Sequence, residues 1–212
     1  MYYINIFGRA NMCYNAKSSI TSYIYVGLIT TILCLYGNKY DRHVALFFFV
    51  VIQMQLAEYL MHLDRKCGLL NKIGTLCAFL ILFIQPISAY ILGEKLETTD
   101  SPDYFKYIYA AWATVGVVLL VMYIIRNKKI CSVKKHGFLM WGFESKNRKT
   151  DAFWGVLYVI LTTLPFLYLK EINIKYLFLF IWIGSWVIHY ILYPNNWKSI
   201  WCFSKWYMTI MP

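Results

Sequence analysis

Six stretches of about 20 mostly apolar residues recur along the chain, each long enough to cross the hydrocarbon core of a bilayer as an α-helix. Apolar residues occupy consecutive positions in them, whereas a transmembrane β-strand alternates apolar with polar residues. The sequence therefore predicts an all-α, polytopic membrane helix bundle, with spans at residues 19–36, 43–62, 73–92, 104–125, 152–169 and 174–193.

The composition agrees, because 60% of the 212 residues are hydrophobic, 15% are charged and the mean hydropathy is +0.51. A soluble domain has about 45–50% apolar and 25% charged residues. The segments between the spans are too short for a separate domain. We expect a cytoplasmic N-terminal segment at residues 1–18, in which translation starts at Met1 or Met12, a transmembrane domain at 19–193, and an aromatic, basic tail at 194–212 that lies at the membrane interface.

Lysine and arginine are distributed unequally between the two sides of these spans, and the cytoplasmic loops of membrane proteins carry the excess. Of the 21 lysine and arginine residues, fifteen lie on the same side of the membrane as the two chain ends. The other six lie on the opposite side: Lys39, Arg42, Lys95, Lys106, Lys170 and Lys175. The bias predicts that both ends are cytoplasmic. Because it accounts for the net charge of +11, we expect no nucleic-acid partner.

The longest loop, residues 126–151, is strongly basic and contains an apolar island at residues 137–143 that is too short to span and could lie on the membrane surface. A basic cluster beside a span favours anionic lipid headgroups. We expect its basic residues to contact headgroups, namely Arg126, Lys128, Lys129, Lys134, Lys135, Lys146, Arg148 and Lys149.

The cysteines and histidines indicate neither a disulfide framework nor a metal site. Cys13, Cys67, Cys131 and Cys202 are expected on the cytoplasmic side, where thiols stay reduced, and Cys34 and Cys77 within spans. No structural disulfide is therefore expected. The four histidines are widely separated and no Cys-x-x-Cys pair occurs, so we expect no metal and no cofactor.

Polar residues gather on one face of the second span, where Gln55, Glu58, Tyr59 and His62 fall within roughly 100° of arc. An ionisable group inside a membrane is costly and needs a structural or functional reason. Glu58 and His189 lie at the same expected depth, so we predict a contact between them if the second and sixth helices are neighbours.

Two interpretations of this cluster remain open. A carboxyl and an imidazole away from water can pass a proton near neutral pH, which predicts a proton or ion relay. Alternatively, the same groups hydrogen-bond the helices together. Gln85 in the third span has the same ambiguity, as either an amide partner of Gln53 or part of a polar pathway.

Three segments resemble an uncharacterised family of small multi-pass membrane proteins of large DNA viruses and unicellular eukaryotes: residues 12–19 (MCYNAKSS), 40–47 (YDRHVALF) and 53–59 (QMQLAEY). That family begins Met-Cys-Trp-Ser-Ala and carries Gln-x-x-Glu in its second span, matched here by Gln55 and Glu58. Tyr14 and Asn15 depart from its Trp-Ser pair. The resemblance implies a start at Met12 and singles out Glu58 and Gln85, but it implies no activity.

These observations leave three expectations for function. The first is a small transporter or channel-like protein with a polar pathway through Gln55, Glu58, His62, Gln85 and His189. The second is a non-catalytic membrane scaffold or assembly protein that binds anionic lipid or a partner through its basic loop. A homo-oligomer also remains open. The third is a lipid-modifying enzyme, for which no catalytic residue can be named. An organelle membrane and a virion membrane both remain open.

Overall fold

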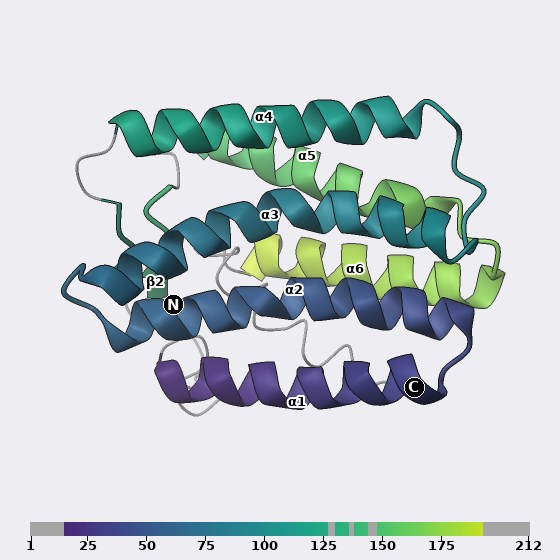
Figure 1. Ribbon diagram of the computed structural model, residues 1–212, viewed down its shortest axis with the longest axis horizontal. Coiled ribbons are helices and arrows are strands. Elements are labelled where there is room, and N and C mark those ends of the chain that lie inside the picture. Colours follow the sequence, from purple (N-terminus) through teal and green to yellow (C-terminus); the bar gives the residue numbers. More distant parts are fainter. Residues whose placement is uncertain (1–14, 127–129, 136–137, 144–147, 193–212) are drawn as a thin grey trace, which may run out of the picture.

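The computed structural model describes residues 15–126, 130–135, 138–143 and 148–192, which form six helices and one short hairpin. The predicted all-α bundle is confirmed, and consecutive helices alternate in direction (Figure 1). The helices are α1 (Ala16–Tyr36), α2 (Lys39–Leu63), α3 (Leu69–Lys95), α4 (Phe105–Arg126), α5 (Arg148–Leu167) and α6 (Ile172–Leu192).

Four of these helices, α1 to α4, are long and apolar enough to cross a membrane, whereas α5 and α6 contain shorter apolar stretches, at residues 152–167 and 172–188. Large apolar side chains such as Leu28 on α1, Val117 on α4 and Phe180 on α6 are exposed on the outside of the bundle. Exposed apolar surface of this extent suits contact with lipid. The chain is therefore an integral membrane protein.

Helix α2 is central, since it packs between α1 and α3 and more than half of its apolar window is buried. Its start is sharply defined, because Asn38 and Asp41 form a capping box that satisfies exposed backbone N–H groups of the first turn. Small residues at intervals of three or four on α1, including Ser19, Ser22 and Thr30, are buried, and they let α1 approach closely.

An aromatic cluster holds α2 against α5 and α6. The Phe47 ring lies 5.1 Å from Phe166, 5.9 Å from Phe178 and 5.4 Å from Trp182, measured between centroids. Aromatic pairs at these separations contribute beyond their buried area. Helices α2 and α6 are therefore neighbours, which is the condition that the predicted Glu58–His189 contact required.

The two ends of the bundle are closed differently. At one end, which we call the hairpin end, strands β1 (Val133–Lys135) and β2 (Phe138–Met140) pair antiparallel beside the α2–α3 turn. At the other, the bridge end, the α3–α4 and α5–α6 loops meet through a single β-bridge between Thr99 and Leu169. The hairpin falls in the long basic loop, and we call residues 132–135 and 138–143 the hairpin region.

The apolar island of that loop is not simply laid on the membrane surface. Leu139 and Trp141 are buried against Met54 and Met61 of α2 and Ala78 of α3. Hydropathy identified the island as too short to span, but only the packing shows that it completes the core of the hairpin end.

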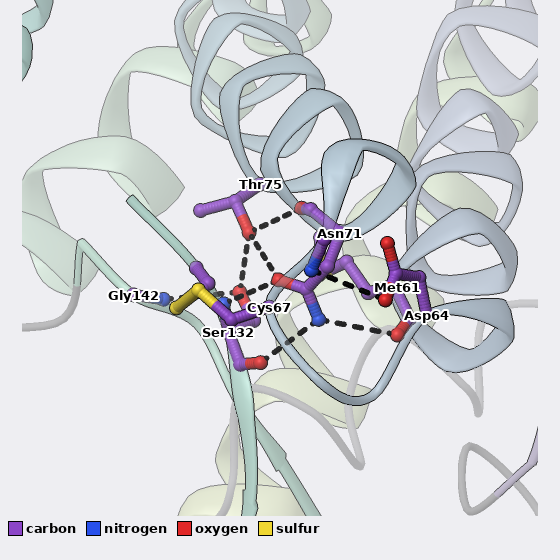
Figure 2. The surroundings of a disulfide bond; sticks show 9 residues. Met61, Asp64, Cys67, Asn71, Thr75, Ser132 and Gly142 are labelled. Atoms are coloured by element: carbon purple, nitrogen blue, oxygen red, sulfur yellow. Dashed lines mark hydrogen bonds between the residues drawn. A yellow bond between two sulfur atoms is a disulfide. The ribbon is translucent and has the colours of Figure 1, made fainter. Parts of the chain in front are cut away.

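The expectation that no disulfide forms is wrong. Cys67, in the α2–α3 turn, is bonded to Cys131, which directly precedes the hairpin region (Figure 2). The prediction considered only the expected compartment, whereas the fold brings two positions 64 residues apart in sequence to a Cα–Cα distance of 5.4 Å. Of the cysteines in the described part of the chain, Cys34 and Cys77 are free thiols.

Candidate functional site

The polar residues of α2 line one buried face on successive turns. The exposed fractions are 2% for Gln55, 0% for Glu58 and 4% for His62, whereas Tyr59 is half-buried. These positions are three and four residues apart, so their side chains project in similar directions. An acid and a base are thus placed one turn apart inside a helix of membrane-spanning length.

This polar face continues the face of α2 that packs on α6. Phe47 precedes Glu58 by eleven residues, which is close to three helical turns, so the two residues lie on the same side. Phe47 contacts Phe178 and Trp182, and α6 runs in the same direction as α2 (Figure 1). Advancing both helices by eleven residues from the Phe47–Phe178 contact brings Glu58 level with residue 189 of α6. The His189 side chain lies outside the described residues, so its contact with Glu58 stays a prediction.

Gln85 of α3 contacts α5 rather than α2, the helix that was expected to provide its partner. The Tyr158 hydroxyl of α5 donates to Gln85 Oε1, and both side chains are buried. Gln53 instead donates to the Phe49 carbonyl of its own helix. The predicted Gln53–Gln85 pair is therefore wrong, and the amide of α3 joins α3 to α5.

His43 is a buried polar residue that sequence reasoning passed over. Its Nε2 lies 3.1 Å from the Ala89 carbonyl and its Nδ1 lies 2.8 Å from the Thr98 hydroxyl. A carbonyl only accepts, so Nε2 carries the proton and Nδ1 accepts from Thr98. The ring also stacks on Phe166, with centroids 5.0 Å apart. His43 is the first residue of the expected second span. A histidine at the end of a span is usually interpreted as a residue at the membrane interface, so its sequence position gave no sign of these contacts.

Asn71 is the second residue that the sequence did not single out. Its Nδ2 donates to the carbonyls of Met61 (3.2 Å) and Ser132 (3.0 Å), and its Oδ1 accepts from the Ser132 N–H (2.8 Å). The Ser132 hydroxyl in turn bonds Thr75 Oγ1 and accepts from the Gly142 N–H. Figure 2 shows this network beside the disulfide, where it fastens the hairpin region to α2 and α3. In the sequence, Asn71 resembles an ordinary loop residue.

Five of the eight expected headgroup-binding residues lie in described elements at the hairpin end. Arg126 is exposed in the last turn of α4. Lys134 and Lys135 belong to β1, and Arg148 and Lys149 to the first turn of α5, but the structure does not describe their side chains. Lys128, Lys129 and Lys146 lie outside the described residues.

Chemistry at the site rests on the ionisable groups of α2. In the described part of the chain, no group of three His, Cys, Asp or Glu residues could hold a metal ion. Comparisons with protein-family models, with curated proteins and with solved structures find no match for this chain. Among the described residues, the buried carboxyl of Glu58 is therefore the group that most directly indicates a function.

Proposed function

We propose that the protein is a small transporter or channel-like membrane protein in which Glu58 binds and releases a proton. The observation that carries this proposal is the complete burial of the Glu58 carboxyl in a membrane-spanning helix. Ionisable residues in such positions are rare and commonly mark ion or proton pathways. Glu58 lies seven residues, or about 10 Å, from the middle of α2 toward the hairpin end.

The neighbouring groups support a proton route from the hairpin end. His62 is one turn closer to the end of α2 than Glu58, and an imidazole has one ring nitrogen that can accept a proton and another that can donate one. Gln55, one turn deeper, offers an amide that can hydrogen-bond either the acid or the carboxylate form. A proton would enter at His62, pass to Glu58 and continue inward.

The aromatic cluster separates Glu58 from His43 at the bridge end. Phe47, Phe178 and Trp182 occupy this interval on the face of α2 that packs against α6, where their rings form an apolar barrier. Passage of a proton along this face of α2 therefore requires these rings to separate and admit water. The proposal predicts that Phe47→Ala raises proton flux, because it shortens this apolar barrier.

The test is proton flux into liposomes that contain the purified protein, measured at several pH values for wild type and Glu58→Gln. The amide resembles the protonated acid in shape but cannot carry a proton, so flux is expected to fall to the protein-free level. Asp100→Asn is the matched control, since Asp100 is an exposed acid outside the helices and its loss should leave flux unchanged. Wild-type liposomes that show no flux above protein-free liposomes would refute the proposal.

A scaffold is the second candidate, favoured by a specific set of contacts. Buried polar side chains join helices at several points: Trp112 donates to the Phe83 carbonyl, Tyr109 donates to the Leu161 carbonyl, and Tyr158 donates to Gln85. Bonds of this kind stabilise membrane bundles. In this function Glu58 only stabilises the fold, and the basic hairpin end binds anionic headgroups. Glu58→Gln would then lower stability in a protein that conducts nothing.

A further inference from the structure

The disulfide joins two segments that the charge bias places on the cytoplasmic side. Cys67 lies in the α2–α3 turn, directly after the exposed residues Arg65 and Lys66, and Cys131 lies just before β1. In the cytosol thiols are kept reduced, and the disulfides that do form there are mostly transient or redox-sensing. Both cysteines are half-buried rather than enclosed, so a thiol reagent can reach them.

The two cysteines are held close by contacts that do not need the bond. Asn71 binds both the N–H and the carbonyl of Ser132, which is the residue directly after Cys131. On the other side, the Gly68 N–H donates to Asp64 Oδ1 and fixes the turn that contains Cys67. The two reduced thiols therefore remain near each other. This proximity favours formation of the disulfide in the folded protein.

The disulfide lies at the start of a segment that is held in place by buried apolar side chains. Leu139 and Trp141 of the hairpin region are buried against Met54, Ala57 and Met61 of α2. These three residues lie on the face adjacent to Gln55, Glu58 and His62. How firmly the hairpin is held therefore determines how well this part of α2 is covered at the hairpin end.

We propose that Cys67 and Cys131 form a reversible redox clamp that locks the hairpin onto α2 and α3 when oxidised and releases it in part when reduced. The oxidant is a small-molecule disulfide such as oxidised glutathione. One cysteine thiolate attacks it, a mixed disulfide forms and one glutathione thiolate leaves. The second cysteine thiolate then attacks the mixed disulfide and expels the second glutathione, so two protein thiols are oxidised while one external disulfide is reduced to two thiols. This proposal does not depend on Glu58 as a proton site.

The test is a redox titration of the full-length protein in lipid nanodiscs, across glutathione buffers from fully reduced to fully oxidised. Peptide mass spectrometry after thiol alkylation gives the fraction of Cys67–Cys131 bond, with Cys34 and Cys77 as internal controls that should stay alkylatable at every ratio. Hydrogen exchange of residues 130–143 is measured on the same samples. We expect the bond to form and break reversibly, and exchange to quicken on the order of tenfold or more in the reduced state.

Variants and a labelling experiment complete the test. Cys131→Ser should exchange like reduced wild type and should not respond to the glutathione buffer, whereas Cys34→Ser should follow wild type. A bond that resists excess reduced glutathione in the folded protein, or one that never forms, would overturn the proposal. Unchanged exchange of residues 130–143 between the two states would also overturn it. So would labelling of reduced Cys67 by a membrane-impermeant maleimide applied outside intact cells, because the pair would then face an oxidising compartment.

Discussion

The hairpin end should depend on one buried amide, which Asn71→Leu removes at nearly constant volume. The change leaves three backbone groups without their partner: the carbonyls of Met61 and Ser132 and the N–H of Ser132. A buried group that loses its hydrogen bond costs about 1–3 kcal/mol, so we expect a loss of at least about 3 kcal/mol if the hairpin stays in place.

Release of the hairpin limits this loss. Exposing Leu139 and Trp141 costs about 1.5–3 kcal/mol each, partly offset by the chain entropy that is regained. The two routes are therefore comparable, and we expect a net loss of about 3 kcal/mol, which appears as local opening at the hairpin end. That energy corresponds to roughly a hundredfold faster hydrogen exchange at the Ser132 and Gly142 amides, measured by mass spectrometry with the disulfide intact.

Thr75→Val is the matched control for this prediction. It removes the hydroxyl that bonds the Ser132 hydroxyl but leaves all three Asn71 bonds to backbone. The expected cost is about 1 kcal/mol, or roughly fivefold faster exchange. If Asn71→Leu accelerates exchange no more than Thr75→Val does, the amide does not fasten the hairpin and the reasoning is refuted.

Three further predictions concern packing, a buried pair and an exposed pair, all read from the midpoint of thermal unfolding in detergent. Gly74→Ala places a Cβ 2.6 Å from a backbone carbonyl of α2, so α2 and α3 must separate, at a cost of about 1–3 kcal/mol; an unchanged midpoint would contradict this packing. Tyr158→Phe removes the donor to buried Gln85 and should cost about 1–3 kcal/mol, part of which the double variant with Gln85→Leu recovers. Asp100→Asn breaks an ion pair between the side chains of Asp100, which is 77% exposed, and Lys170, which is 38% exposed, and should cost less than about 1 kcal/mol of stability. A larger loss would show that the bridge end depends on this charge.

Hydropathy and helical periodicity determined much of this protein from its sequence. The length of each apolar run predicted six helices, and their ends agree with the structure to within about four residues. The shared face of Gln55, Glu58 and His62 was also predictable, because residues three and four apart on a helix project together whatever surrounds them. All three prove to be buried.

Only the tertiary structure decided which distant residues meet. The Cys67–Cys131 bond, the partner of Gln85 and the roles of His43 and Asn71 all join segments far apart in sequence. The short hairpin likewise gains its place from Leu139 and Trp141, whose burial depends on a groove formed by two other helices. Hydropathy is summed over residues that are neighbours in sequence, so it identifies the segments that leave water. Which distant side chains contact each other depends on how the helices are arranged, and many arrangements of the same helices have equal hydropathy.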